Sequence, residues 1–272
     1  MNRISILGFG YMGEALARGL STRFPDIEIA VLEKRSERRE LCDTLGYTSF
    51  AGRQLKDFLG FCDTVVLSIK PQDLDALTGT NANDTGTSEP DQFAAVDVLS
   101  ILAGTSITTL QATLHPRGVA RLMPSLAAQV GHCAVGVTLP DSAPEALRAK
   151  ALLVAEAMGT AYELPERLMS AITGLSGSGI AYVFAFIHAL ALGGTRAGIP
   201  YPQSLAIARE VTAGAAELLS RSGDHPIEAL SRVISPAGTT IEGVSVLEER
   251  GFSAAVIEAV IAAADRAAEL EG

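Results

Sequence analysis

The stretch ILGFGYMGE, residues 6–14, constrains the fold of this chain more than any other. It follows a short apolar run and precedes a helical pattern of apolar residues over 12–20. Gly8, Gly10 and Gly13 thus form GxGxxG between a predicted strand and a predicted helix. There, the first glycine permits a tight turn, the second lets the main chain approach a pyrophosphate, and the third lets helix and strand pack closely. The stretch predicts a dinucleotide site that includes Tyr11 and Met12.

An acidic residue, Glu33, ends the second predicted strand, twenty positions after the last glycine of the motif. An acid at this place usually accepts a hydrogen bond from a ribose hydroxyl, which favours NAD. Lys34 and Arg35 follow immediately and would suit the 2′-phosphate of NADP. The two signals conflict, so NADP and NAD both stay open from sequence, as does a simple solvated strand end.

Strand and helix patterns alternate through the first part of the chain. Apolar runs predict strands at 3–8, 27–32, 63–69, 96–102, 119–123 and 134–139, and helical patterns cover 12–20, 36–46, a segment from Pro71 and 144–158. Such alternation predicts a mostly parallel sheet covered on both faces. The polar segment TGTNANDTGTSEPDQ, residues 78–92, is predicted to be a mobile surface loop.

Polar and small residues follow the strands of this sheet where parallel strands present their carboxyl ends. Open α/β sheets bind ligands at that edge. We therefore expect further cofactor contacts from the segments after the third and fourth predicted strands. The candidates are Ser68, Ile69, Lys70 and Pro71, with Ala103 and Gly104 in the next segment. Pro71 also suits the first position of a helix, and both roles are compatible.

Alanine-rich helical patterns replace strand patterns after about residue 164. We interpret 1–164 as a dinucleotide-binding domain and 165–272 as an all-helical domain. The helical faces are apolar and rich in small side chains, as in 253–270, so we expect them to pack against a second copy of the chain.

The overall charge and the remaining polar residues exclude several other classes. A net charge of −10 argues against nucleic acid and anionic membranes, and no apolar run is expected to approach the ~20 residues that span a bilayer. Three separated cysteines without a CxxC motif, and a start without a cleavage-site pattern, indicate a cytoplasmic protein. The four histidines have no metal-ligand spacing, so no metal site is predicted.

Six blocks of sequence resemble the pyrroline-5-carboxylate reductase family over nearly the whole chain. They are ILGFGYMGEALARGL, SIKPQDL, LSILAGTSITTL, RLMPSLAAQVGHCAVGV, TGLSGSGIAYVFAFIHALALGGTRAGI and HPIEALSRVISPAGTTIEGVSVLEERGF. The resemblance implies an α/β Rossmann-type N-terminal domain plus an all-α C-terminal dimerisation domain, with the active site between them. It also implies hydride transfer from NAD(P)H to C5 of 1-pyrroline-5-carboxylate, an imino acid that becomes proline. Pro124 and Ser125 join the cofactor candidates by the same resemblance.

The last two blocks contain the candidate substrate residues. The resemblance implies that Ser176–Gly179 and Ala237–Thr240 surround the substrate, the second segment coming from the partner subunit. We interpret GLSGSGIAY, residues 174–182, as a second glycine turn that opens a helix and holds the substrate carboxylate. Ordinary helix capping is the alternative for both segments. Thr240 and Ser178 are the catalytic candidates, and Ser176, Gly177, Gly179, Ala237, Gly238 and Thr239 are the substrate-binding ones.

Three positions depart from the family pattern at this expected site. Ser125 stands where MPN has asparagine, Ile180 where proline follows SGSG, and Ala237 where SPGGTT has its first glycine. If Ala237 needs a positive φ, strain follows. Three functions therefore stay open: a pyrroline-5-carboxylate reductase, a reductase of another cyclic imine or imino acid, and a regulatory paralogue without catalysis.

Overall fold

The computed structural model describes residues 2–77 and 91–271. All but the last two residues of the predicted loop at 78–92 therefore lie outside the described part. The chain forms two compact units, one reaching to Ser178 and resuming at Ala262, the other spanning Gly179–Ile261. The predicted domain boundary between 164 and 165 stays a prediction.

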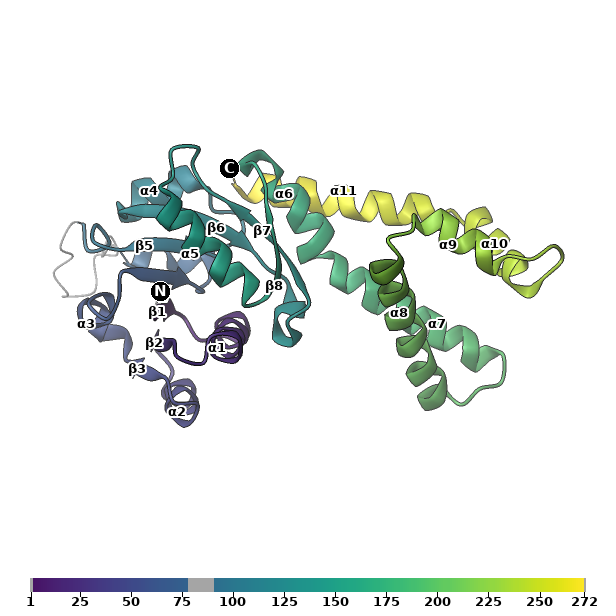
Figure 1. Cartoon of the computed structure of the whole chain (residues 1–272), viewed down its shortest axis with the longest axis horizontal. Helices are drawn as coiled ribbons and strands as arrows, with labels where there is room; N and C mark the ends of the chain where they lie inside the picture. Colours follow the sequence, from purple (N-terminus) through teal and green to yellow (C-terminus); the bar gives the residue numbers. More distant parts are fainter. Residues whose placement is uncertain (1, 78–90, 272) are drawn as a thin grey trace. The chain divides into compact units, whose positions relative to one another are not determined.

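An eight-stranded sheet forms the centre of the first unit within the described residues (Figure 1). Its strands, in chain order, are β1 (Arg3–Leu7), β2 (Glu28–Leu32), β3 (Thr48–Phe50), β4 (Thr64–Leu67), β5 (Asp97–Ser100), β6 (Gly118–Met123), β7 (Cys133–Thr138) and β8 (Gly159–Glu163). They lie in the order β3-β2-β1-β4-β5-β6-β7-β8, and every neighbouring pair is parallel except β6 and β7. The predicted, mostly parallel sheet is confirmed, with β3 and β8 added at its edges.

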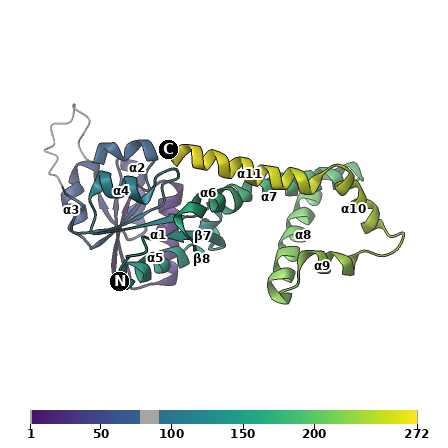
Figure 2. The same cartoon turned by 90° about the horizontal axis from the view of Figure 1, so that it is seen from above.

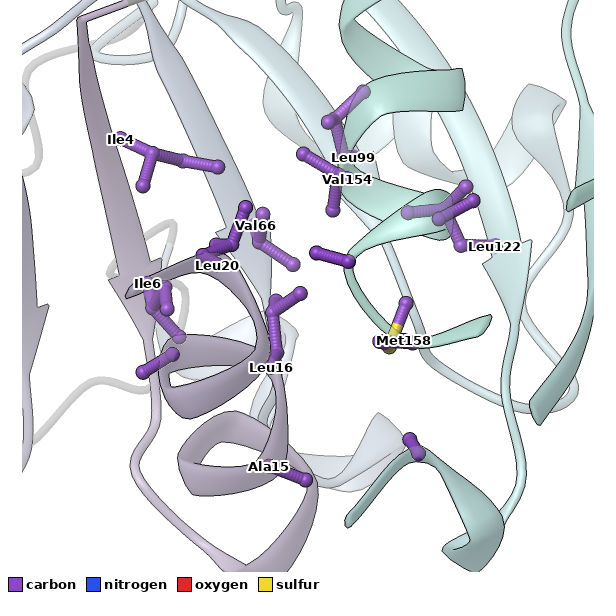
Figure 3. Close-up of a cluster of buried hydrophobic side chains, with 14 of the residues drawn as sticks. Ile4, Ile6, Ala15, Leu16, Leu20, Val66, Leu99, Leu122, Val154 and Met158 are labelled. Atoms are coloured by element: carbon purple, nitrogen blue, oxygen red, sulfur yellow. The ribbon is translucent and has the colours of Figure 1, made fainter. Parts of the chain in front are cut away.

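Helices cover both faces of this sheet (Figure 2). The first unit contains α1 (Tyr11–Arg23), α2 (Ser36–Thr44), α3 (Leu55–Leu59), α4 (Ile107–Leu114), α5 (Glu145–Glu156) and α6 (Met169–Ile172). On one face, α1 and α5 bury Leu16 and Val154 against Ile4, Ile6 and Val66 (Figure 3). On the other, α3 and α4 pack on alternate strand residues, as the two-residue period of a strand requires.

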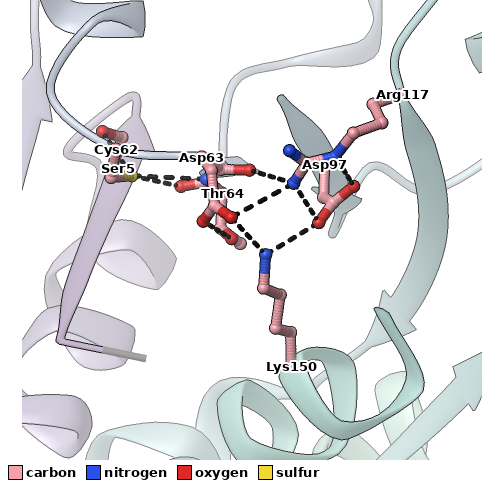
Figure 4. A network of polar contacts seen from close by, with 7 residues as sticks. All are labelled: Ser5, Cys62, Asp63, Thr64, Asp97, Arg117 and Lys150. Atoms are coloured by element: carbon pink, nitrogen blue, oxygen red, sulfur yellow. Dashed lines mark hydrogen bonds and ion pairs between the residues drawn. The ribbon is translucent and has the colours of Figure 1, made fainter. Parts of the chain in front are cut away.

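A network of four charged side chains joins the amino ends of the central strands (Figure 4). Asp97, largely buried at the start of β5, accepts hydrogen bonds from Arg117 Nε at 2.9 Å and Lys150 Nζ at 2.8 Å. Lys150 also donates to Asp63 at 2.8 Å. Its hydrogen bond is the main reason that the pKa of Asp63 falls to about 2. Burial alone would raise the pKa of Asp97, but bonds from Arg117 and Lys150 outweigh it and lower the pKa.

A buried arginine in β6 joins segments that are far apart in the sequence. The side chain of Arg121 is 1% exposed and donates to Glu166 Oε1 at 2.9 Å and to Glu271. Glu166 Oε1 also accepts a hydrogen bond from the backbone N–H of Ile107 at 2.7 Å. Since a buried cation is costly without partners, both carboxylates are needed where they lie. They flank the excursion of the chain into the second unit.

The second unit is helical. It contains α7 (Gly179–Arg196), α8 (Tyr201–Ser222), α9 (Pro226–Val233), α10 (Thr239–Glu249) and the first half of α11 (Phe252–Glu271). Helices α7 and α8 approach closely, since a Cβ on Gly194 would lie 2.2 Å from Ser204 Oγ. Large apolar side chains remain exposed on all five helices, among them Phe184, Val211, Leu218, Ile227, Val246 and Ile257.

The helical segment Glu166–Arg196 corrects one expectation from the sequence. It runs for 31 residues and is long and apolar enough, by length and composition alone, to cross a membrane. The small residues SGSG within this segment predict a turn from the sequence. The structure instead continues the helix through that stretch, so the expectation that no run approaches spanning length was wrong.

The charged network generates a test of stability. Replacing Asp97 by asparagine leaves Arg117 and Lys150 with less compensation, so we predict a loss of roughly 2–4 kcal/mol in the free energy of unfolding. Urea unfolding at pH 7 measures it. Asp141→Asn, at an exposed position, serves as the control and should change stability by less than about 0.5 kcal/mol.

The pH dependence of that difference follows from the sign of the pKa shifts. The folded-state pKa values of both aspartates lie below 3.8, so the stabilisation is complete above about pH 4 and is lost as the pH falls through the folded-state values. The gap between wild type and Asp97→Asn should therefore shrink below pH 4. An equal gap at pH 7 and pH 3 would contradict this assignment.

Candidate functional site

The glycine motif forms the turn between β1 and α1. Gly8 has a φ of +97°, and a Cβ there would lie 2.5 Å from the carbonyl oxygen of Ser68. A Cβ on Gly13 would lie 2.2 Å from the carbonyl oxygen of Gly8. A Cβ on Gly10, in contrast, meets nothing within 4 Å. Two glycines therefore permit close packing, whereas Gly10 faces open space beside the main chain.

This turn lies at the point where the strand order reverses direction. Strands β1 and β4 are neighbours, and the chain connections run outward from them in opposite senses. The N–H of Ser68 donates to the carbonyl oxygen of Leu7 at 2.8 Å, which holds the segment after β4 beside the glycine turn. Such switch points form the crevice in which open α/β sheets bind dinucleotides. The structure thus brings Ser68 to the glycine motif, as predicted.

The amino end of α1 is open to an anion. Gly10 is its N-cap and has no side chain to accept hydrogen bonds from the first turn. The backbone N–H groups of Tyr11, Met12 and Gly13 have no acceptor within the helix, because first-turn groups lack an i−4 partner. Tyr11 is 79% exposed. Open space at Gly10 and free donors on a 13-residue helix fit a pyrophosphate.

Glu33 follows β2 beside this turn and is 7% exposed. Its carboxylate accepts hydrogen bonds from the backbone N–H of Phe9 at 2.9 Å and of Arg35 at 3.0 Å, and from Arg35 Nε at 3.1 Å. Burial raises the pKa of Glu33, but the hydrogen bonds from Arg35 and Phe9 outweigh it and bring the pKa to about 2. The carboxylate is therefore ionised in any neutral buffer.

One side chain outside the predicted site residues supports the turn. Arg38, in the first turn of α2, donates through Nε to the carbonyl oxygen of Phe9 at 2.8 Å and lies over the Phe9 ring at 5.0 Å. The main chain of Phe9 is thus held at its N–H by Glu33 and at its carbonyl by Arg38. The sequence shows an arginine five residues after Glu33, but four cations lie within 34–39 and the pattern does not distinguish which of them contacts the turn.

The other cofactor candidates occupy varied surroundings in the first unit. Ile69 and Lys70 follow β4, and Pro71 begins a short 3₁₀ turn rather than the longer helix expected. Gly104 has a φ of +68°, and its Cβ position lies 3.0 Å from the carbonyl oxygen of Leu270. Close packing against α11 therefore accounts for that glycine by itself, while Ala103 beside it is exposed.

The segment after β6 gives Ser125 a structural partner. Ser125 is 7% exposed, its N–H donates to Cys133 Sγ at 3.0 Å, and its hydroxyl lies 3.3 Å from the same sulfur. The side chain is therefore already paired within the unit. Cofactor contacts from Pro124 and Ser125 stay predictions.

The SGSG stretch is not a glycine turn that opens a helix, which corrects the sequence interpretation. Residues Thr173–Gly177 form a π-helical turn within a continuous helical run, and the N–H of Ser178 donates to the carbonyl oxygen of Thr173 at 2.8 Å. The hydroxyl of Ser176 donates to the carbonyl oxygen of Ala134 in β7 at 2.5 Å. Helical hydrogen bonding therefore continues to Ser178, and α7 begins at the next residue, Gly179. Such π-helical turns are nonetheless frequent at functional sites.

The second candidate segment does open a helix. Gly238 is the N-cap of α10, without a side-chain cap, and Thr239 and Thr240 form its first turn. Ala237 has a φ of +54°, so the left-handed conformation considered from the sequence is present. An alanine there is strained by about 1–2 kcal/mol relative to glycine. This segment belongs to the second unit, whereas 173–178 belongs to the first.

Fold and site together define a class. A glycine turn, an open helix start and an acidic β2 end at the switch point of a parallel sheet, followed by a helical unit, describe a dinucleotide-binding oxidoreductase. Among the described residues, no group of three or more His, Cys, Asp or Glu side chains is placed to hold a metal ion.

Comparisons with known proteins identify the family. Residues 166–270 match the model described as pyrroline-5-carboxylate reductase dimerisation, and residues 3–88 match one described as NADP oxidoreductase, coenzyme F420-dependent. The pyrroline-5-carboxylate reductase of Aquifex aeolicus is 35% identical over 98% of this chain and 97% of its own length. That of Methanosarcina acetivorans is 42% identical over 76% and 75%. The chain belongs to the pyrroline-5-carboxylate reductase family.

A solved structure agrees with this fold. The 1-pyrroline-5-carboxylate reductase of Streptococcus pyogenes, 27% identical, superposes with a TM-score of 0.83 over 98% of each chain. The expected α/β Rossmann-type domain followed by an all-α dimerisation domain is thereby confirmed.

The different surroundings of the three glycines predict different effects of substitution. Gly10→Val should fold normally, because its side chain enters open space, but should weaken NADH and NADPH binding at least 100-fold by filling the pyrophosphate position. Gly13→Val should instead destabilise the chain, since its Cβ would overlap Gly8. Thermal melting and fluorescence titration measure both effects. Tight cofactor binding by Gly10→Val would refute the assignment of the turn.

Proposed function

We propose that this chain reduces 1-pyrroline-5-carboxylate to L-proline, with NADH or NADPH as the electron donor. The observation that carries the proposal is the open helix start at Gly10, at the switch point of a chain that aligns along 98% of its length with a pyrroline-5-carboxylate reductase. A bound nicotinamide supplies the hydride. In the balanced reaction, the imine carbon gains the hydride, the ring nitrogen gains a proton, and NAD(P)⁺ is released.

The chain's own part in this reaction is binding and orientation. Hydride transfer to a C=N bond needs neither a nucleophile nor a metal, but it needs both reactants held face to face. We assign the pyrophosphate to the free N–H groups of Tyr11 and Met12, and the adenosine ribose to the end of β2. The segments Ser68–Pro71 and Ala103–Gly104, with Pro124 and Ser125, are the proposed walls towards the nicotinamide.

The substrate side of the site is assigned to two segments. We propose that the first turn of α10, contributed by a second copy of the chain, binds the substrate carboxylate, because its N-cap, Gly238, leaves the N–H groups of Thr239 and Thr240 uncovered. The Thr240 hydroxyl is the candidate to hydrogen-bond the ring nitrogen. We also propose substrate contacts from the π-helical turn and the residues after it. They come from the side chains and the close-packed backbone of Ser176, Gly177, Ser178 and Gly179.

We also propose that a second copy of the chain covers the exposed apolar side chains of the second unit. The match of residues 166–270 to a dimerisation model supports this, and so does the exposure of Phe184, Leu218 and Ile257. It also gives the apolar segment Glu166–Arg196 a partner other than lipid. We propose a cytoplasmic location, without nucleic acid or membrane as partner, because the net charge is −10 and the three cysteines are free.

Self-association has a direct test. Sedimentation at micromolar concentration should give a mass of at least twice 28.3 kDa. Leu218→Glu should lower that mass, because a buried charge opposes association, whereas Glu217→Gln on the same helix should not. A wild-type chain that stays monomeric would overturn the proposal.

Initial rates test the reaction itself. With 1-pyrroline-5-carboxylate we expect cofactor oxidation and one proline formed per cofactor. Thr240→Val, which swaps a hydroxyl for a methyl group, should lower kcat about 10²-fold with little change in melting temperature. Thr212→Val is the matched control, because that hydroxyl donates to the carbonyl oxygen of Ala208 within α8. An unchanged rate in Thr240→Val would remove Thr240 from the mechanism.

Two outcomes would favour the other functions. The strained Ala237 stands within the proposed carboxylate site, which keeps a different cyclic imine open as substrate. Faster turnover of another cyclic imine than of 1-pyrroline-5-carboxylate would select that function. If no imine is reduced while cofactor still binds, a regulatory role is favoured.

A further inference from the structure

The Glu33 carboxylate is fixed by main-chain groups as well as by a side chain. Two of its donors, the N–H of Phe9 and the N–H of Arg35, belong to the backbone at 2.9 Å and 3.0 Å. The Arg35 guanidinium adds bonds at 3.1 Å and 3.2 Å. The side chain of Glu33 is 8% exposed and that of Arg35 is 53% exposed. If the guanidinium turned away, the carboxylate would therefore still be held in place.

The neighbouring guanidinium groups are engaged within the chain. Arg39 donates to the carbonyl oxygens of Glu33 at 2.9 Å and Lys34 at 2.7 Å. Arg38 donates to Phe9, as described above, and to Glu14 Oε2 at 2.7 Å. Of the four cations at 34–39, the Lys34 side chain is the one without a hydrogen bond or ion pair among the described residues.

These contacts determine which hydrogen-bond acceptors and cations the end of β2 presents to an adenosine ribose. A ribose 2′-hydroxyl is a donor, and a fixed, ionised carboxylate is a good acceptor for it. A 2′-phosphate is largely deprotonated at pH 7, where it carries about −1.5 to −2 charges and therefore acts mainly as an acceptor. To bind Arg35 it would have to separate the guanidinium from Glu33, and the carboxylate would remain beside the phosphate. Like charges in one partly buried site disfavour each other strongly.

We propose that this chain selects NADH over NADPH, with Glu33 as the specificity-determining residue. Glu33 accepts the ribose hydroxyl and also neutralises Arg35, the cation that a 2′-phosphate would otherwise use. The inference rests on the proposed function, since it concerns the cofactor of that reaction. The sequence motif alone does not choose a cofactor, because Glu33 favours NAD whereas Lys34 and Arg35 favour NADP.

Cofactor affinity, measured without any imine, tests the proposal. Titration of dihydronicotinamide fluorescence should give a Kd for NADH at least ten-fold lower than that for NADPH. Glu33→Ser removes the carboxylate and frees Arg35, so it should tighten NADPH at least ten-fold, weaken NADH several-fold and invert the ratio. Glu40→Gln removes one negative charge from an exposed position of α2 and should leave the ratio within two-fold of wild type.

A second variant keeps the test decisive if Glu33→Ser folds poorly, which thermal melting would reveal. Arg35→Gln should keep the preference for NADH, because the Arg35 guanidinium is paired with the Glu33 carboxylate and does not bind the cofactor. A selective loss of NADPH affinity of ten-fold or more in Arg35→Gln would show that Arg35 binds the 2′-phosphate and would overturn the proposal. Wild-type binding of NADPH as tight as that of NADH would overturn it too.

The two proposals fail separately. Because no imine is present in the titration, a wrong cofactor preference leaves imine reduction untouched. Conversely, if no imine is reduced, the Kd values for NADH and NADPH can still be measured and compared.

Discussion

Two ion pairs of the buried Arg121 guanidinium hold Glu166 and Glu271, from distant parts of the sequence, together within the first unit. Arg121 lies in β6, almost fully buried, and its charge is balanced by Glu166 and Glu271. Removing either carboxylate would leave charge uncompensated in a dry environment, a larger cost than the pair itself contributes. The chain therefore leaves the first unit after Glu166 and returns to Glu271 beside the same strand, β6. Pro124 and Ser125 directly follow that strand.

Much of the fold was predictable because the sheet is parallel and buried on both faces. Such strands are continuous apolar runs, and DTVVLSI and VDVLSIL are unmistakable. The edge strands were missed for the opposite reason. β3 has three residues, and β8 alternates exposed side chains, so neither has a run to detect. Helix α4 was missed because three threonines in ITTLQATL weaken its helical pattern.

The candidate site was predictable where chemistry depends on local sequence. The roles of Gly8 and Gly13 follow from spacing, and the positive φ of Ala237 follows from a turn that has glycine in the family. What escaped the sequence was hydrogen bonding at a distance. Small residues in SGSG are compatible with a turn or a π-helical segment, and only the bonds across Thr173–Ser178 decide between them. Likewise, nothing local indicates that Glu33 accepts a bond from Phe9, 24 residues earlier.

The long separation between Arg121 and its second carboxylate has a consequence for biosynthesis. Glu271 is translated 150 residues after Arg121, and all of the helical second unit is made in the interval. During synthesis, Arg121 has one of its two carboxylate partners, Glu166, until the second unit and the rest of α11 have been made. Final consolidation of the nucleotide-binding half is therefore a late event in synthesis.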